Sequence, residues 1–560
     1  MSGAKKKLAQ KEAMVQLGLT EKEKKALAES ARKKRNTLLA IVAGVIAVAL
    51  VVVLLVWNSG FISRHTTALE VNGHKYSVAD VNYYYRQLVT NAYNQELYYA
   101  QLYQQLALQG MDYGGYTPAF NLNEDLSTQY VDEEQTQSFH DYFLEQTKTE
   151  MANLTALVDA AKAAGHTLSE DAKAEREEAL ASIDEQVRQN SLGGRAAFLR
   201  RVYGRTVNEA VYLKNLDMML LAQDYQKATL DTMTDYSDEE LKAYYEENSA
   251  LYNSYDYDYV YFDGTPVLGT DDDGNTIEAT EADKTQAMAD AKKKAEGLVA
   301  DVKAARTATL EEGENRQSFA DVALAYTSDS TTRTRILGTN FQGTLYYDWL
   351  TDSARKDGDI EIFESEGTGY YVIQFHNAYF YDEPTVDVRH ILIKAETDAD
   401  AETNEYGVAI PTDAQMQAAH DQAEELMKQF NLGERTADDF GALAEEHSDD
   451  GRNTDGSLRA AGGLYTDIHK GDMVPNFNDW IFDPSRQEGD VGLVENAGPG
   501  YFGWHVVYFQ AGYEPEWIRG TSGSNGVRDA LSSADQAAWL ESVEEGYEAV
   551  ATSAISQVHL

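Results

Sequence analysis

Cysteine is absent from the 560-residue sequence. Its absence excludes disulfide bonds, zinc sites built on cysteine and catalysis by a thiol nucleophile. It also excludes the lipid-attachment cysteine of bacterial lipoproteins, so any membrane anchor must be part of the polypeptide itself.

Basic residues are scarce outside the first 36 positions. The chain has 47 Lys and Arg against 93 Asp and Glu, a net charge of -46. Residues 1–36 carry eleven basic and four acidic side chains, which leaves -53 for the remainder. A body this acidic repels nucleic acid, and its basic residues form no stripe with interleaved aromatics. We therefore expect no nucleic-acid partner, and different environments for the two ends of the chain.

One long uncharged apolar run lies near the amino terminus, from Leu38 to Trp57. Its length is close to the roughly 20 residues that a helix needs to cross the hydrocarbon core. The run is longer than the apolar part of a cleavable signal, and residues 58–60 offer no small-x-small cleavage pattern. We therefore expect an uncleaved transmembrane helix at residues 37–57.

The charges beside this run predict its orientation. Residues 32–35 are all basic and directly precede it, and basic flanks remain on the cytoplasmic side of a membrane. Residues 1–36 are therefore expected to form a basic cytoplasmic tail. The rest of the chain is expected outside the cytoplasm, held at the cell membrane by this single span.

A chain of this length needs several domains of roughly 100 to 200 residues each. Residues 66–250 are expected to be all-helical after a short entry hairpin at Asn72-Gly73, with a capping box at Ser237 that begins one more helix. The helices are rich in tyrosine. Tyrosine at this density favours either a peptide-binding surface or a core of packed helices, and both interpretations remain open.

Two consecutive segments, residues 254–380 and 384–513, repeat one pattern. Each has an alternating strand near its start, a Trp followed nine residues later by Gly-Asp, and a Gly-aromatic strand at its end. The corresponding positions are Tyr255 to Phe262 and Val386 to Ile393, Trp349 with Gly358-Asp359 and Trp480 with Gly489-Asp490, and Gly369-Tyr370 and Gly503-Trp504. The pattern predicts two tandem domains with the element order β-α-α-β-α-β-β.

Two histidines in the second copy lie on strands. Because side chains alternate along a strand, His390 shares a face with Val388 and Leu392, and His505 shares one with Val507. Two imidazoles are therefore expected to project toward the domain interior. Taken alone, a histidine in such a place is more often a hydrogen-bonded core residue than a catalyst.

The surrounding motifs change that balance. The second copy contains, in order, Val388-Arg389-His390-Ile391-Leu392-Ile393, Phe440-x-x-Leu443-Ala444, Ser448-Asp449-Asp450, Gly462-Gly463-Leu464, Met473-Val474-Pro475-x-Phe477, Gly489-Asp490-Val491 and His505-Val506-Val507. This series resembles the parvulin peptidyl-prolyl cis-trans isomerases over residues 384–513. Several ordered motifs are far more specific than any one of them.

The resemblance implies a set of site residues. The catalytic positions that it implies are His390, Asp450 and His505. The substrate-binding positions that it implies are Leu464, Met473, Phe477 and Phe502. Val474 and Phe502 depart from the family, in which a glutamine and a small hydroxyl residue are common at or near these positions. The implied reaction needs no nucleophile, no metal and no cofactor, because rotation about an X-Pro bond makes or breaks no covalent bond.

The first copy keeps the pattern and loses these residues. Tyr259 stands for His390, Tyr371 for His505, Ser330 for Asp450 and Tyr346 for Phe477, and the Met-x-Pro segment has no counterpart. We therefore expect a degenerate parvulin-like domain at residues 254–380, with a spacing or peptide-binding role.

The flanking regions resemble the PrsA and SurA group of extracytoplasmic foldases, in which a helical chaperone domain accompanies parvulin domains. The residues that carry this weaker match are Val71-Asn72-Gly73 and the segment from Asp238 to Asn248. A carboxy-terminal helix, expected within residues 527–560 and capped at Ser533, would dock on the chaperone region. The expected fold class is thus multidomain α+β: a transmembrane helix, a helical chaperone-like domain, two parvulin-like domains and a terminal helix.

Three functions remain open. The first is a foldase that isomerises X-Pro bonds in secreted or envelope proteins and binds them while they are unfolded. The second is an inactive, membrane-anchored holdase, and the third is an adaptor of an envelope assembly complex. The intact residues of the second copy favour the first. An acidic run, Asp271-Asp272-Asp273, lacks the first and last ligands of a calcium loop, so no metal site is expected there.

Overall fold

A computed structural model describes residues 21–108, 116–267, 279–309, 315–498 and 500–560. The chain divides into two compact units, Met1–Met233 with Gln536–Leu560, and Thr234–Asp535. The acidic run at residues 271–273 and the first twenty residues of the basic tail lie outside the described residues. Each unit is considered by itself below.

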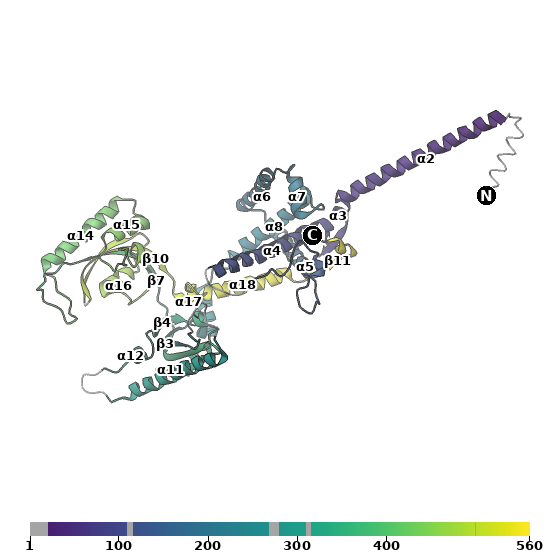
Figure 1. The fold of residues 1–560 in the computed structure, drawn as a ribbon. Coiled ribbons are helices and arrows are strands. Elements are labelled where there is room, and N and C mark those ends of the chain that lie inside the picture. Colours follow the sequence, from purple (N-terminus) through teal and green to yellow (C-terminus); the bar gives the residue numbers. More distant parts are fainter. Residues whose placement is uncertain (1–20, 109–115, 268–278, 310–314, 499) are drawn as a thin grey trace. The chain divides into compact units, whose positions relative to one another are not determined.

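The first described element is helix α2 (Glu21–Asn58), drawn in purple in Figure 1. Its stretch Arg32–Leu54 has a mean hydropathy of 3.1 and none of it is buried. Leu38, Val45 and Leu54 are each more than half exposed. A continuous exposed surface of this kind is unfavourable in water, and the helix is long and apolar enough to cross a membrane.

The first unit contains a set of antiparallel and crossing helices. These are α3 (Phe61–His65), α4 (Val78–Leu108), α5 (Phe139–Ala163), α6 (Glu170–Gln189), α7 (Arg195–Tyr203) and α8 (Glu209–Leu230), with a short 3-10 helix η1 (Leu126–Thr128). Side chains of Ser138, Ser169 and Asn208 cap α5, α6 and α8 by accepting hydrogen bonds from backbone N–H groups of the first turn.

The tyrosines of α4 divide between core and surface. Tyr83, Tyr84 and Tyr85 are at most 2% exposed and belong to the main hydrophobic cluster of the unit, whereas Tyr98 and Tyr99 near the other end of the helix are exposed. The buried tyrosines agree with a core of packed helices, and a peptide-binding surface stays a prediction for the exposed ones at the other end of the helix.

A small sheet interrupts the expected all-helical region. Strands β1 (Thr67–Val71) and β2 (His74–Ser77) form the hairpin, with Asn72 and Gly73 at positive φ in its turn. Strand β11 (Ala549–Ala551) pairs antiparallel with β1, so the sheet order is β11-β1-β2. Sequence alone does not show this strand because its pairing partner is almost 500 positions away.

The terminal helix also differs from expectation. Helix α18 (Val527–Glu544) begins before Ser533, which is not its cap, and it ends before residue 550. Gly546, with φ 82°, follows the last turn and lets the chain leave the helix. Trp539, Leu540 and Val543 of α18 pack against Leu157 and its neighbours within the first unit. The 3-10 helix η4 (Ser553–Gln557) follows β11.

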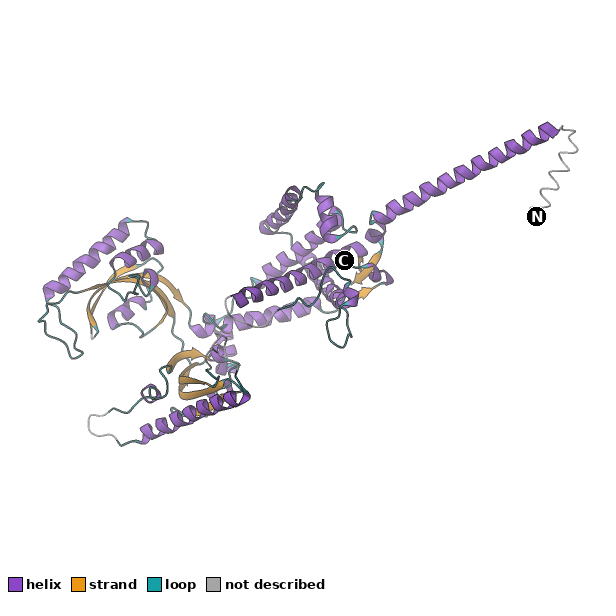
Figure 2. Cartoon of the chain, in the orientation of Figure 1, coloured by secondary structure: helices purple, strands orange, loops and turns teal. Residues whose placement is uncertain are grey.

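The second unit contains two four-stranded antiparallel sheets (Figure 2, orange) with matching strand orders, β4-β3-β6-β5 and β8-β7-β10-β9. The elements of the first copy are β3 (Ser254–Asp263), α11 (Glu281–Thr307), α12 (Phe319–Ala323), β4 (Thr331–Leu337), η2 (Gly338–Phe341), α13 (Tyr347–Leu350), β5 (Ile360–Ser365) and β6 (Gly369–Tyr379). Those of the second copy are β7 (Thr385–Lys394), α14 (Asp413–Leu432), α15 (Ala437–His447), η3 (Ala461–Gly463), β8 (Leu464–His469), α16 (Pro475–Ile481), β9 (Val491–Gly498) and β10 (Tyr501–Tyr513).

Three further helices, α9 (Asp238–Glu247), α10 (Ser249–Tyr252) and α17 (Glu516–Arg519), flank the two copies. Their side chains Leu241, Tyr252 and Trp517 share one hydrophobic cluster with Val527 at the start of α18. The capping box at Ser237, expected from the sequence, is present at the start of α9.

In the second copy the sheet separates two hydrophobic clusters. Helices α14 and α15 cover one face, where Phe430 and Phe440 pack against Val506 and Tyr508. Helix α16 covers the other, where Phe477 and Ile481 pack against Val507 and Phe509. Because residues of β10 alternate between these faces, His505 lies on the α16 side.

Candidate active site

Two neighbouring strands bring the histidines together. Strands β7 and β10 pair antiparallel, with His390 opposite Val507 and His505 opposite Leu392. The two imidazoles are therefore diagonal neighbours on one face, and their Nδ1 atoms lie 3.1 Å apart. His390 is 7% exposed and His505 3%. The alternation of the two strands thus places both rings in one buried position.

Asp450 reaches the histidines from the loop after α15. The Ser448 hydroxyl accepts hydrogen bonds from the backbone N–H groups of Leu392 and Asp450, and the Asp449 carboxylate accepts one from the N–H of Lys394. Ser448 and Asp449 therefore fasten this loop to β7. With the loop held there, Asp450 Oδ2 lies 3.4 Å from Nε2 of His390.

Two tyrosines complete the polar network. The hydroxyl of Tyr465 donates to Asp450 Oδ2 at 2.8 Å, and the hydroxyl of Tyr501 lies 3.0 Å from Nε2 of His505. The hydrogen bonds from His390 and Tyr465 hold the pKa of Asp450 well below its usual range. Burial, together with the carboxylate of Asp450, raises the pKa of Tyr465 to about 12. Asp450 is therefore ionised at neutral pH and Tyr465 keeps its proton.

Burial governs His505. Loss of hydration, followed by the nearby His390, lowers the pKa of His505 to about 3. The ring is consequently neutral in the physiological range, and a neutral imidazole has one donor and one acceptor nitrogen.

For neutral imidazoles the protons have one consistent arrangement. Ionised Asp450 only accepts, so His390 Nε2 carries the proton and His390 Nδ1 accepts from Nδ1 of His505. Nε2 of His505 is left as the acceptor for the hydroxyl of Tyr501. The donors thus run in one direction, from Tyr501 through both rings to Asp450.

An apolar surface adjoins the network. Phe477 on α16 is 2% exposed, and its ring centroid lies 5.5 Å from that of His390 and 5.0 Å from that of His505, both edge to face. Met473 is partly buried against the same cluster. Pro475 stands at the first turn of α16, where its missing N–H costs no hydrogen bond.

Comparison with known proteins identifies this segment. The family described as the PPIC-type PPIASE domain, or rotamase, matches residues 390–511. These residues form a parvulin-type peptidyl-prolyl isomerase domain. The chaperone SurA of Hahella chejuensis is 36% identical over 88 residues, which cover 16% of this chain and 18% of that protein. The chain thus matches less than a fifth of the length of this relative.

A solved structure is also similar to the chain. The crystal structure of PrsA from Bacillus subtilis matches with 15% sequence identity, over 45% of this chain and 79% of that one, with a TM-score of 0.13. The parvulin-type domain, its similarity to a part of SurA and the apolar helix α2 fit a membrane-anchored parvulin.

Two of the expected substrate-binding residues of the parvulin domain are displaced by one position. Leu464 pairs with Arg389 across β7 and β8, on the α15 face, whereas Tyr465 pairs with Val388 and its ring lies 5.0 Å from His390. Phe502 likewise alternates with His505 and lies on the face of Trp504. Tyr465 and Tyr501 take their places beside the histidines.

Neither tyrosine was among the expected site residues. A tyrosine directly beside an expected apolar site residue could have indicated them. A shift of one residue in a strand moves every side chain to the opposite face, so the neighbour is the alternative candidate. Met473, Phe477, Asp450 and both histidines do gather at one place in the parvulin domain.

The first copy keeps the shape of this ring cluster. Tyr259 and Tyr371 take the diagonal positions of the two histidines in the strand pairing, and Tyr346 takes the place of Phe477. Their ring centroids lie between 5.7 and 6.4 Å apart. The hydroxyl of Ser330, which stands for Asp450, is buried without a hydrogen-bond partner in the described part of the chain. The first copy therefore keeps the arrangement of the three rings, although it lacks the two histidines and the carboxylate.

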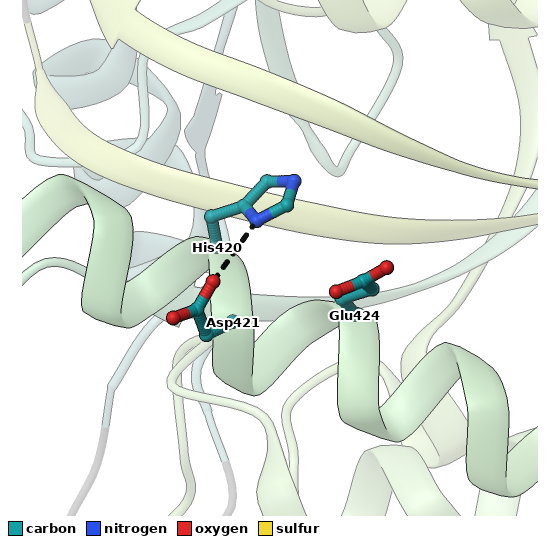
Figure 3. Close-up of side chains that lie close together, drawn as sticks. All are labelled: His420, Asp421 and Glu424. Carbon is teal, nitrogen blue, oxygen red and sulfur yellow. Dashed lines mark hydrogen bonds and ion pairs between the residues drawn. The ribbon is translucent and has the colours of Figure 1, made fainter.

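Another histidine of the parvulin domain lies beside carboxylates. Figure 3 shows His420, Asp421 and Glu424 along α14, and their potential ligand atoms lie within 4.8 Å of one another. The ring of His420 packs edge to face against Trp504, on the α14 side of the sheet. Glu424 also pairs with Lys428 at 3.2 Å. Side chains as exposed as Asp421 are common without an ion, so this group indicates no metal site.

Proposed function

We propose that this chain is a membrane-anchored foldase that isomerises X-Pro peptide bonds in secreted or envelope proteins. The observation that carries the proposal is the hydrogen-bonded series from Tyr501 through His505 and His390 to Asp450, next to the buried ring of Phe477. A buried polar series that lies against an apolar surface is suited to hold a peptide group while its surroundings stay dry.

The apolar side of the site would bind the proline. Met473, Phe477 and the ring of Tyr465 offer a surface for the pyrrolidine ring, whose burial removes apolar area from water. Rotation must overcome a barrier of roughly 18 to 20 kcal/mol, because the twisted amide loses its resonance. The twisted amide is less polar than the planar one, so a dry pocket favours it.

The polar side of the site would act on the carbonyl group. In the planar amide the carbonyl oxygen carries partial negative charge that decreases on twisting. The ionised carboxylate of Asp450 disfavours the planar form more than the twisted one when the oxygen lies nearby. His390 and His505 would hold Asp450 and the peptide in place, and the neutral ring of His505 adds no charge to the pocket.

Client binding would involve the helical unit. Leu97, Tyr98 and Tyr99 of α4 are exposed, and a hollow of about 470 Å³ is lined by Tyr99, Leu102, Tyr103, Leu106 and Tyr116. Exposed aromatic surface of this kind is suited to unfolded segments, because tyrosine gives wide contact area at a low entropic cost. This surface supports a chaperone role beside the isomerase.

The location would follow from α2. With residues 1–36 in the cytoplasm and residues 37–57 across the membrane, the remainder of both units lies on the extracytoplasmic side. The acidic composition of these units agrees with an unfolded-protein partner rather than nucleic acid.

Isomerisation of an X-Pro peptide by the detergent-solubilised full chain tests the proposal. We expect catalysis that falls by about tenfold or more in His390→Ala and in Phe477→Ala, a loss of roughly 1.4 kcal/mol or more in transition-state stabilisation. His420→Ala, which removes a histidine from the opposite side of the same domain, is the matched control and keeps full activity.

The outcome separates the two leading functions. No catalysis by the well-folded parent chain would exclude the isomerase and favour a holdase, for which the exposed tyrosines of α4 are the supporting observation. Suppression of client aggregation by His390→Ala at the level of the parent would show that binding and isomerisation are separate activities.

A further inference from the structure

A cationic cavity lies in the first unit, immediately after the apolar helix. It has a volume of about 680 Å³. Two of its lining residues, Ile62 and Ser63, come only a few positions after Asn58, the last residue of α2. Arg86, Arg200 and Arg205 line it, and none of its lining side chains is acidic. In a chain whose residues after position 36 carry a net charge of -53, three arginines around one cavity are a marked exception.

Arg86 has an unsatisfied hydrogen-bond donor at this cavity. Its Nε is buried and has no hydrogen-bond partner among the described residues. Loss of hydration lowers the pKa of the Arg86 guanidinium, and the nearby Tyr85 offsets this only in part. Gly204, with φ 79°, gives the guanidinium its space, since a Cβ there would lie 3.0 Å from Cζ of Arg86. A half-buried guanidinium with an unsatisfied donor is stabilised when an anion binds it.

Hydrogen-bonding groups accompany the arginines. Asn82 and Thr206 are buried, and Asn82 joins the two walls of the cavity by donating to Thr206 and accepting from the backbone N–H of His559. Arg64 donates to the carbonyl groups of Ser59 and Thr206 and so links the end of α2 to the same wall. The cavity is thereby attached to the exit of the apolar helix.

Part of the rim of the cavity is apolar. Ile62 and Leu560, which line it, are 41% and 36% exposed, and Phe61 and Val202 nearby in sequence are 51% and 38% exposed. Apolar side chains around a basic centre match the boundary between phospholipid headgroups and acyl chains.

We propose that this cavity binds the phosphate group of an anionic phospholipid at the membrane surface where α2 emerges. The inference depends on α2 crossing a membrane, and it is independent of the isomerase activity and of which leaflet is involved. The arginines would contact the phosphate, and Ile62, Phe61 and Leu560 would lie against the beginning of the acyl chains. The lipid would thereby hold the helical unit against the membrane.

Hydrogen exchange of the full chain in lipid nanodiscs tests this assignment. Discs of phosphatidylcholine alone are compared with discs containing increasing phosphatidylglycerol, and protection is followed in residues 195–207 and 553–560. We expect protection to rise with phosphatidylglycerol. Arg86→Gln and Arg200→Gln should each raise the fraction needed for half-maximal protection roughly fivefold, since a basic residue near an anionic surface contributes about 1 kcal/mol.

The control is Arg201→Gln, which removes an exposed arginine of the same helix that does not line the cavity. Protection that does not depend on phosphatidylglycerol, or an equal loss in Arg201→Gln, contradicts the proposal. Equal protection by inorganic phosphate in phosphatidylcholine discs overturns the lipid assignment. If the chain does not enter the discs at all, α2 is not a membrane anchor and the proposal fails with it. Arg200 is exposed, so Arg200→Gln tests the cavity even if Arg86→Gln does not fold.

Discussion

At the residue scale, two tyrosine hydroxyls decide how the candidate site holds its protons. Tyr501 caps one end of the histidine pair, and Tyr465 holds the carboxylate at the other end. Without these hydroxyls either tautomer of His505 could form, and Asp450 could turn away from His390. The two tyrosines are therefore positioning residues, which act through the histidines and the carboxylate.

Replacement of Tyr501 by Phe tests this role. The ring remains, but His505 Nε2 loses its donor, so the isomerisation rate should fall by about fivefold, the effect of one hydrogen bond worth roughly 1 kcal/mol. Tyr508→Phe is the matched control, because Tyr508 lies on the other face of β10 against Phe430 and Phe440. Peptide isomerisation by the full chain measures both. A rate unchanged in Tyr501→Phe contradicts the assigned proton arrangement.

The low pKa of His505 predicts how stability depends on pH. The unfolded chain protonates this histidine near pH 6.5, whereas the folded protein does so only near its pKa of about 3. Between these values the unfolded state binds more protons, so stability falls as pH decreases from about 6.5 toward 3. Hydrogen exchange of β10, corrected for the intrinsic effect of pH, measures this loss.

The same experiment on His505→Gln provides the control. Glutamine does not titrate, so this variant should lack the part of the pH dependence that His505 causes, while other groups keep theirs. An identical pH dependence in the two proteins would mean that His505 is hydrated and titrates normally.

At the element scale, the strands near the site could be predicted from the sequence. Which residues of β8 and of the start of β10 face the histidines could not. The alternation around His390 and His505 located both strands, because half-buried strands repeat every two residues. Leu464 and Phe502 were each assigned one position from the residue that faces the histidines. A family motif that has one residue more or fewer before a strand shifts the register of that strand by one position. A single sequence gives no measure of the packing energy that would reveal this shift.

Close approach of loops to strands also determines the site. Gly463, with φ 66°, packs so tightly on β7 that a Cβ would lie 2.3 Å from the carbonyl oxygen of His390 and 3.1 Å from Cβ of Ala444. The Gly-Gly motif therefore has a physical reason, since it lets the start of β8 pass beneath α15 and place Tyr465 beside His390.

Gly463→Ala should accordingly disturb the site. Alanine at positive φ costs about 1 kcal/mol, and overpacking against β7 adds about 1–3 kcal/mol. Gly456→Ala is the control, because Gly456 also has a positive φ, of 90°, but nothing lies within 4 Å of its Cβ position. Hydrogen exchange of β7 and the isomerisation rate measure the difference. Equal effects of the two changes would mean that only backbone strain matters.

At the scale of the whole molecule, the chain leaves the first unit after Met233 and returns to it at Gln536. Pairing of β11 with β1 and burial of Val558 complete the core of that unit with residues from the far end of the chain. The repeat and the apolar helix were readable from sequence because both are local patterns. This closure was not, because a three-residue strand has no periodicity and its partner is distant.

Val558→Asn tests whether the closing segment stabilises the helical unit alone. Val558 is fully buried, so an unpaired amide there should cost about 2–4 kcal/mol, from lost burial and an unsatisfied polar group. Val550→Asn, at a position 62% exposed, is the control and should cost little. Hydrogen exchange should increase in α4 and α5 of the Val558 variant. The isomerisation rate of a short peptide should stay unchanged, because the parvulin domain lies in the other unit. If that rate falls as well, the two units unfold together.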